Sequence, residues 1–419
     1  FRPTLDFNFA AEKKLDSRIT YSRTGTASFV NEFGKVVLVG DNTPRFDHDP
    51  ATRESKGLLI EESRTNMITY STDYTNSIYN LSGYEGVISQ EFGTAPDGGL
   101  TDAFIGEGNT GRHTLYPKVG TSLSNNTKYS MSIFVKRVSN NANERYCKLE
   151  TASYSTWTHS GSSAVFDLSN GTEVTSPSSN ITSGIETYPN GWFRIHFVST
   201  TATVATSTGF YLNITNSTGD TSSTTLTSSQ GLLVYGTQME AGAFPTSYIP
   251  TNGSTATRGV DITIIDGDEF TEFYNDNEWT MITDTNVDNS QALVASPSAV
   301  NSINFEGDNN TKKFQTRYVT SSTDNQGYVD VIGNMSGTSY FDLVGGGTGN
   351  YNMKTAFAAK VNDVAASFNG ETVQTDTSVT MLEGGSIMNI GQNPKQFHIK
   401  RIMYYPKRLP NSQLVTLTS

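Results

Sequence analysis

The chain has 419 residues, which at roughly 150 residues per domain suggests two or three domains. It carries 29 Lys and Arg against 41 Asp and Glu, a formal charge of −12, and a surface this acidic repels phosphate backbones and argues against nucleic-acid binding. The 22 Phe, 20 Tyr and 3 Trp supply a folded core, and the Ser-, Thr-, Asn- and Gly-rich remainder favours β-structure with many turns.

Residues 1–65 are predicted to form an extended arm. Residues 28–30 and 35–39 flank a hairpin turn at residues 31–34. The segment holds too little apolar material for a core of its own, so we expect it to pack on the next domain or on another subunit. Asp47-His48-Asp49 lies between Pro44 and Pro50, which predicts a charged turn.

Residues 66–257 show the period of two that is typical of strands. Tyr129, Met131, Ile133 and Val135 alternate with polar or outward positions. The Asn-Gly pair at residues 170–171 is a hairpin signal. Strands at intervals of about 8–15 residues, separated by polar turns, predict an antiparallel sandwich of the jelly-roll type.

Residues 258–419 predict a second sandwich. Strands are expected around Trp279, at residues 313–318 and at residues 398–405, followed by a short helix that begins near Asn411 or Ser412. The predicted fold class is therefore all-β: two antiparallel β-sandwiches preceded by an extended N-terminal arm. No stretch approaches the ~20 apolar residues of a membrane span, so no membrane insertion is predicted.

One polar stretch has the composition of a sugar-binding platform. Sugar rings stack on exposed aromatic faces, and polar side chains beside them bind the hydroxyl groups. The predicted glycan-binding residues are Tyr146, Tyr154, Trp157 and His159. The alternative is that these aromatic residues pack on the edge of the sandwich. Trp192 and Trp279 lie within strand patterns and are predicted to be core residues.

Acidic residues are densest at the start of the second sandwich. Oxygen-rich loops there could hold Ca²⁺, with Asp266, Asp268 and Asp276 as ligands; the alternative is a set of solvated acidic turns. The single cysteine, Cys147, excludes a disulfide framework within one chain and fits folding in a reducing cytoplasm. No catalytic motif is found, and we expect a protein that is not an enzyme, although paired carboxylates from separate strands leave a glycosidase open.

Several segments resemble a family of structural proteins of tailed bacteriophages, mostly tail or head fibres. The opening of those proteins is similar to residues 16–27 (DSRITYSRTGTA), 44–50 (PRFDHDP) and 57–66 (GLLIEESRTN). The exit from their carbohydrate-binding-module-like jelly roll is similar to residues 235–242 and 246–251. The last strand of their laminin-G/concanavalin A-like domain resembles residues 397–409.

The resemblance implies a non-enzymatic virion fibre. Such a protein is commonly a homotrimer, is assembled in the host cytoplasm, and is exposed on the extracellular particle. Its N-terminal arm would contact other virion proteins of the tail, portal or capsid, and it would bind host-surface polysaccharide. The alternatives are a structural adaptor or decoration protein with no glycan ligand, and a polysaccharide depolymerase.

Overall fold

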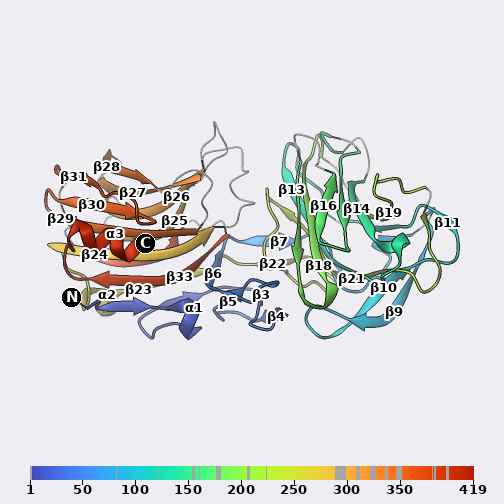
Figure 1. Cartoon of the computed structure of the whole chain (residues 1–419), viewed down its shortest axis with the longest axis horizontal. Coiled ribbons are helices and arrows are strands. Elements are labelled where there is room, and N and C mark those ends of the chain that lie inside the picture. Colours follow the sequence, from blue (N-terminus) through green and yellow to red (C-terminus); the bar gives the residue numbers. More distant parts are fainter. Residues whose placement is uncertain are drawn as a thin grey trace.

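The chain folds into two antiparallel β-sandwiches arranged end to end (Figure 1). The computed structural model describes residues 2–419 apart from 82, 120, 153–155, 160, 176–180, 205–207, 223, 288–298, 308–311, 321–326, 336–337, 346–351, 380, 382–383 and 393–395. Every ladder between two strands in this described part is antiparallel; in one of them, for example, Leu5 lies opposite Tyr404. The predicted all-β fold class is confirmed.

The first sandwich consists of two six-stranded sheets. One has the order β17 (Thr182–Thr187), β18 (Phe193–Thr200), β13 (Lys128–Arg137), β21 (Gly231–Ala241), β10 (Leu100–Ile105) and β9 (Val87–Thr94). The other has the order β16 (Thr172–Thr175), β15 (Ser163–Asp167), β14 (Tyr146–Thr151), β19 (Phe210–Thr215), β12 (Thr114–Pro117) and β8 (Tyr79–Asn80). Short additions to this sandwich are the pair β11 (Thr110–Gly111) and β20 (Thr224–Thr225), and the 3₁₀ turns η1 (Ala142–Glu144) and η2 (Pro189–Gly191).

The second sandwich has a seven-stranded and an eight-stranded sheet in the described residues. The first runs β2 (Thr20–Ser22), β23 (Ile262–Asp266), β32 (Gly385–Gln392), β25 (Ala299–Gly307), β26 (Lys312–Thr320), β27 (Gly327–Met335) and β28 (Thr338–Gly345). The second runs β31 (Gln374–Asp376), β30 (Val364–Phe368), β29 (Asn352–Lys360), β24 (Glu278–Val287), β33 (Gln396–Tyr405), β6 (Ser55–Glu61) and β5 (Phe46–His48), with β1 (Leu5–Phe7) also pairing with β33.

Three short helices complete the second sandwich. They are α1 (Phe9–Glu12), α2 (Gly267–Thr271) and α3 (Asn411–Thr418), and α3 begins where the sequence predicts the final helix. Leu414 of α3 is buried with Ile282 and Tyr405 on the outer face of the eight-stranded sheet. In the part of the chain that the structure describes, none of the helices has the length and apolarity needed to cross a membrane.

The N-terminal arm is part of the second sandwich. Strands β1, β5 and β6 extend one of its sheets and β2 extends the other, while Leu5, Phe7 and Phe9 are buried in its core with Trp279. The arm was expected on the next domain or on another subunit; in this chain it packs chiefly on the C-terminal sandwich instead. The predicted shortage of apolar residues explains this, because the arm contributes strands to a core that later residues supply.

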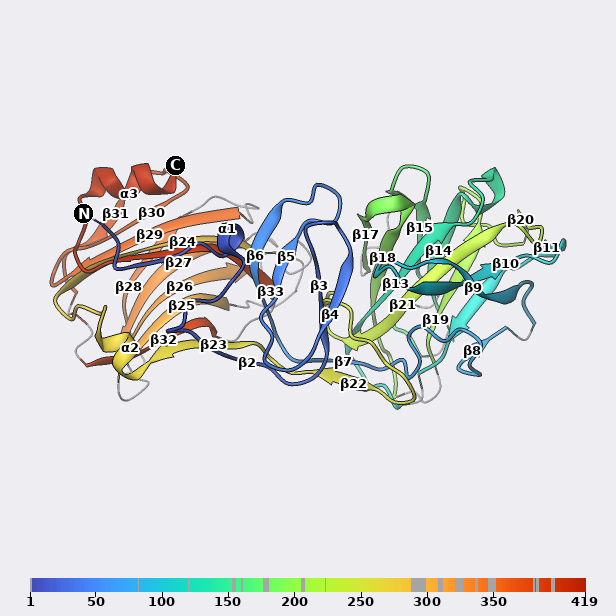
Figure 2. The ribbon, with the colours of Figure 1, turned by 90° about the horizontal axis from the view of Figure 1, so that it is seen from below.

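The arm also covers the first sandwich. The hairpin of β3 (Ala27–Val30) and β4 (Val36–Val39) lies between the two sandwiches (Figure 2), at the turn that the sequence predicts. Val30 and Val36 pack with Phe134, which lies on the face of β13 opposite the sandwich core. Strand β13 is therefore buried on both faces rather than on one. The pair β7 (Arg64–Asn66) and β22 (Ala256–Arg258) forms the remaining connection between the sandwiches.

Candidate functional site

Trp157 is a buried residue and presents no exposed face. Its side chain is only 2% exposed and belongs to the core of the first sandwich. The indole N–H donates to the Ala152 carbonyl oxygen at 2.8 Å, and the ring meets Tyr129 edge to face. The prediction that Trp157 forms a sugar platform is therefore wrong, because its ring is packed among core residues and is not available for stacking.

Tyr146 does not lie together with Trp157. Tyr146 begins β14, and Ala152, whose carbonyl oxygen binds the Trp157 indole, follows the end of this strand. Tyr146 and Ala152 are therefore about 20 Å apart at ~3.3 Å per residue. Tyr146 is half-buried beneath the Arg145 guanidinium, 4.9 Å from the ring centroid, and His159 is half-buried in a loop. Tyr154 lies outside the described residues.

The predicted calcium ligands do not form a metal site. Asp266 precedes α2, Asp268 lies in its first turn, and both are exposed, as is Asp276. Among the residues that the structure describes, no three His, Cys, Asp or Glu side chains form a group that could hold a metal ion. The three side chains are solvated, as the alternative states, but Asp266 ends β23 and Asp268 lies in α2 rather than in a turn.

An aromatic group that the sequence analysis did not select lies on the outer face of the six-stranded sheet containing β14 and β19. We call Tyr84, Arg112, Tyr116 and Tyr211 the tyrosine cluster. The ring of Tyr211 lies 5.8 Å from that of Tyr84 and 4.7 Å from that of Tyr116, both edge to face. The guanidinium of Arg112 lies over Tyr84 at 5.2 Å and over Tyr211 at 4.7 Å, within the range of a cation–π contact.

Strand periodicity builds this face. In β19, Phe210, Leu212 and Ile214 point into the core, so Tyr211 and Asn213 point outward. In β14, Leu149 is a core residue and Glu150 points outward opposite Tyr211. The alternation of residues 210–214 is the signal that could have located the cluster, but sequence alone does not reveal which strands lie beside β19.

Polar side chains surround the tyrosine cluster. Arg112 donates to the Asn213 side-chain oxygen at 3.3 Å and to Glu150 at 3.4 Å, and Lys148 approaches Glu150 at 3.1 Å. Burial, followed by the hydrogen bond with Tyr84, raises the pKa of Tyr211, so this hydroxyl stays protonated. With the Arg112 side chain 35% exposed, the face offers aromatic carbon, hydrogen-bond donors and acceptors side by side.

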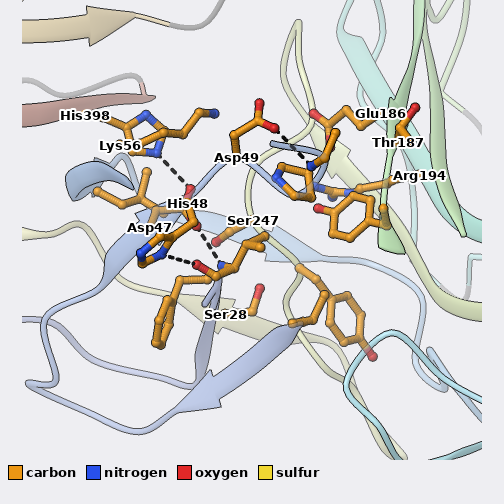
Figure 3. A pocket seen from close by; sticks show the side chains of 18 of the residues that line it. Ser28, Asp47, His48, Asp49, Lys56, Glu186, Thr187, Arg194, Ser247 and His398 are labelled. Atoms are coloured by element: carbon orange, nitrogen blue, oxygen red, sulfur yellow. Dashed lines mark hydrogen bonds and ion pairs between the residues drawn. The ribbon is translucent and has the colours of Figure 1, made fainter. Parts of the chain in front are cut away.

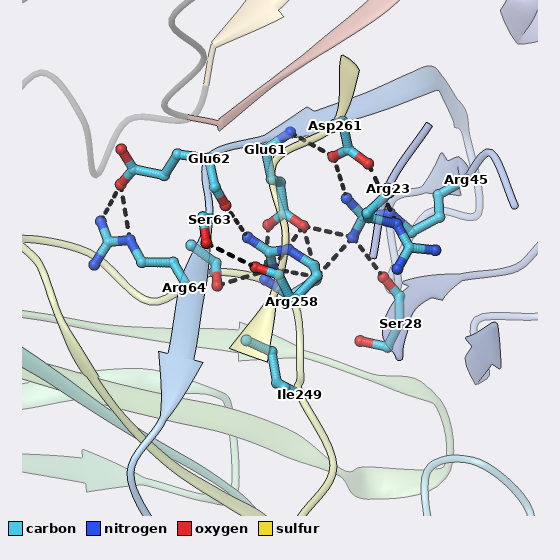
Figure 4. Close-up of polar contacts among 12 residues, drawn as sticks. Arg23, Ser28, Arg45, Glu61, Glu62, Ser63, Arg64, Ile249, Arg258 and Asp261 are labelled. Atoms are coloured by element: carbon cyan, nitrogen blue, oxygen red, sulfur yellow. Dashed lines mark hydrogen bonds and ion pairs between the residues drawn. The ribbon is translucent and has the colours of Figure 1, made fainter. Parts of the chain in front are cut away.

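A second group of polar residues, from the arm and from residues 258–261, lies beside the segment that leaves the first sandwich (Figure 4). We call Arg23, Arg45, Glu61, Arg258 and Asp261 the junction network; all five side chains are fully buried. Arg258 contacts Glu61 at 2.9 Å and Arg45 contacts Asp261 at 2.6 Å. Arg45 also donates to Glu61.

Neighbouring groups complete the junction network. The Glu61 carboxylate accepts from the Ser247 N–H at 2.8 Å and from the Ser247 hydroxyl at 2.6 Å. Burial alone would raise the pKa of Glu61, but Arg258 and Arg45 outweigh it and lower the pKa to about 2. The charged Glu61 at the end of β6 therefore connects the arm to the segment that leaves the first sandwich.

The charged turn predicted at Asp47-His48-Asp49 is not observed. Asp47 and His48 belong to β5 and are buried, because Val30 of the β3–β4 hairpin packs against them through hydrogen bonds to both. Asp47 accepts from the Val30 N–H at 2.6 Å and lies 2.8 Å from His398 Nε2 (Figure 3). Trp192 and Trp279, by contrast, are buried core residues as predicted.

Comparison with known proteins gives no family assignment. No protein-family model and no curated protein matches the chain. Among solved structures, Trypanosoma rangeli sialidase is similar at a TM-score of 0.28 and 9% identity, over 76% of this chain and 60% of that one. A TM-score this low does not indicate a shared fold, and nothing about that enzyme is transferred to this chain.

Proposed function

We propose that this protein is a non-enzymatic virion fibre of a tailed bacteriophage that binds host-surface glycans. In this proposal the tyrosine cluster on the first sandwich contacts the glycan. Homotrimer formation, attachment to other virion proteins and exposure on the particle belong to the same proposal.

The tyrosine cluster is the observation that supports glycan binding most directly. Aromatic rings offer apolar faces to the C–H groups of sugars, and a few placed polar groups fix the orientation of the ligand. Tyr84 and Tyr211 supply half-exposed rings, and Arg112, Glu150 and Asn213 lie within hydrogen-bond distance of one another beside them. Contacts of this kind are individually weak and gain strength when several copies bind together.

The junction network supports a role as a projecting structural protein. Its residues Arg23, Arg45 and Glu61 fall within the segments that resemble phage fibre proteins, and Arg45 and Glu61 both contact Ser247, on the segment that leaves the first sandwich. A fibre that presents a binding face away from the particle needs such a connection between its domains.

The test is binding of the fluorescently labelled protein to candidate host cells, with and without removal of their surface polysaccharide. We expect saturable binding that is lost when the polysaccharide is removed. Tyr211→Ala should weaken it by about tenfold or more, because a stacking contact of roughly 1 kcal/mol is lost from every copy. Tyr70→Ala, at a half-buried tyrosine outside the tyrosine cluster, is the matched control.

The other outcomes point to the alternative functions. Release of reducing sugar from the polysaccharide would indicate a depolymerase. Absence of binding by the assembled protein would favour a structural adaptor. Equal binding by Tyr211→Ala and the wild-type protein would exclude the tyrosine cluster as the contact surface.

A further inference from the structure

A lysine, a glutamate and an asparagine meet on the outer face of the six-stranded sheet that contains β14 and β19. Lys148 of β14 lies directly opposite Asn213 of β19, so their Cβ atoms are about 5 Å apart. Both side chains point outward, because the residues on either side of them in both strands belong to the core. Glu150, two residues further along β14, shares this face. We call Lys148, Glu150 and Asn213 the Lys-Glu-Asn triad.

One carboxylate oxygen is in contact with both of the other members of the triad. Lys148 Nζ lies 3.1 Å from Glu150 Oε2, and the side-chain nitrogen of Asn213 donates to the same oxygen at 3.4 Å. Within the described part of the chain, the Lys148 amine has no other polar partner. The amine and the amide are therefore neighbours around a group that can take up and return protons.

Two donors polarise the amide carbonyl of Asn213. Thr114 of β12 lies opposite Asn213 on the side away from Lys148, and its hydroxyl donates to Asn213 Oδ1 at 2.5 Å. Arg112 Nε donates to the same oxygen at 3.3 Å. Such donors stabilise the negative charge that a carbonyl oxygen acquires when a nucleophile adds to its carbon. Asn213 Cγ is therefore prepared for attack.

The Lys-Glu-Asn triad is largely withdrawn from water. Asn213 and Thr114 are fully buried and Glu150 is 8% exposed, while the Lys148 side chain is 12% exposed. The turn after β19 covers the stem of the lysine, since a Cβ placed on Gly219 would lie 3.8 Å from Lys148 Cδ. Exclusion of water strengthens the electrostatic contacts of the site and prevents competing hydrolysis of the amide.

We propose that the chain joins Lys148 to Asn213 through an isopeptide bond, which cross-links β14 to β19. A structural ion pair would need only Lys148 and Glu150. The observed group supplies in addition every role of an acyl transfer: a nucleophilic amine, a proton carrier, an amide carbon, and donors from Thr114 and Arg112 to its oxygen. The cross-link goes beyond the proposed glycan contact and does not depend on it, although it would fix two strands beneath the tyrosine cluster.

The step is redox-neutral, and all its atoms come from the three side chains. Glu150 takes a proton from the Lys148 ammonium, and the neutral amine adds to Asn213 Cγ, which forms the new C–N bond. Glu150 passes its proton to the Asn213 nitrogen, and the bond between that nitrogen and Cγ breaks. The attacking nitrogen gives up its surplus proton through Glu150 to the departing ammonia, which leaves as ammonium.

The test is the intact mass of the denatured full chain, followed by peptide mapping. Bond formation releases one ammonia, so the mass should be about 17 Da below that of the expressed sequence. Trypsin does not cleave after an acylated lysine, so a digest should contain residues 146–194 joined to residues 195–258. Fragmentation of the joined peptides should place the bond between Lys148 and Asn213.

Three variants separate the roles of the side chains. Lys148→Arg keeps the positive charge but lacks the amine, so its mass should match its own sequence. Glu150→Gln keeps the size of the side chain and removes the proton carrier, and it should slow linkage of freshly made protein by about a hundredfold or more. Lys128→Arg is the matched control, because Lys128 is half-buried in the other sheet and lies opposite Thr200; it should lose ammonia as the wild type does.

The wild-type mass decides the matter even if a variant fails to fold. A mass equal to that of the expressed sequence would overturn the proposal, and so would loss of ammonia with Lys148 and Asn213 in separate peptides. Linkage at an unchanged rate in Glu150→Gln would overturn the role of Glu150. These masses are measured on purified protein without cells, so their outcome is separate from that of the host-cell binding experiment.

Discussion

Glu61→Gln tests whether the junction network stabilises the folded chain. The substitution keeps the size of the side chain and removes its charge, which leaves Arg45 and Arg258 buried with one fewer counter-charge. Removing one partner of a buried ion pair costs about 3–5 kcal/mol. The free energy of unfolding of the variant should therefore be about 3–5 kcal/mol lower than that of the wild-type protein at neutral pH.

The pKa of Glu61 gives a second route to the same magnitude. Its folded pKa of about 2 lies below the ordinary value of 4.5, and at ~1.36 kcal/mol per unit the difference corresponds to about 3 kcal/mol. Because the folded pKa is the lower one, this stabilisation is fully present above pH 4.5 and is lost as the pH falls toward about 2. The difference between wild type and Glu61→Gln should shrink over the same interval.

Urea unfolding followed by tryptophan fluorescence measures both effects, since Trp279 reports on the second sandwich and Trp192 on the first. Glu12→Gln is the control: the Glu12 side chain is 50% exposed and lies 3.5 Å from Lys14, so the change should be below about 1 kcal/mol. A Glu61→Gln effect no larger than that of the control, or one that does not change between pH 4.5 and 2, would refute the reasoning.

Three further predictions concern single buried sites. Trp157→Ala should lower the free energy of unfolding by about 3–5 kcal/mol in a denaturant titration, because it empties a core position; wild-type stability would contradict the observed burial. Gly57→Ala should lower the free energy of unfolding by about 1–3 kcal/mol more than Gly83→Ala. Both glycines have positive φ, but a Cβ at Gly57 would collide with the Ile399 carbonyl oxygen, whereas at Gly83 none of the described atoms lies within 4 Å. Equal melting temperatures of the two variants would contradict this. Burial raises the pKa of the Cys147 thiol, so native protein should react with Ellman's reagent only at its rate of unfolding, and immediate stoichiometric reaction would contradict it.

Local signals predict the elements of this fold well. The period of two at Met131, Ile133 and Val135 identifies a strand whose face enters the first core, and the predicted start of the final helix at Asn411 is observed. Such features depend on residues close in sequence, where side-chain direction and turn chemistry already decide the structure.

The candidate sites were mostly not predictable in this way. The polar neighbours of Trp157 predict a surface position, but a ring is buried or exposed according to what the tertiary structure places over it. The tyrosine cluster joins Tyr84, Tyr116 and Tyr211, which come from separate parts of the chain. No local pattern indicates that these three rings meet.

Composition and hydrophobic periodicity are sufficient to predict the all-β class, the two sandwiches, the core tryptophans Trp192 and Trp279, and the inability of the arm to form its own core. The pairing of the arm with the second sandwich, and the contact of Asp47 with His398, 351 residues away, could not be predicted from local patterns. The reason is physical: hydrophobic periodicity sets the buried face of a strand, but the register between distant strands follows from the packing of the whole core. The junction network exists only where such distant strands meet.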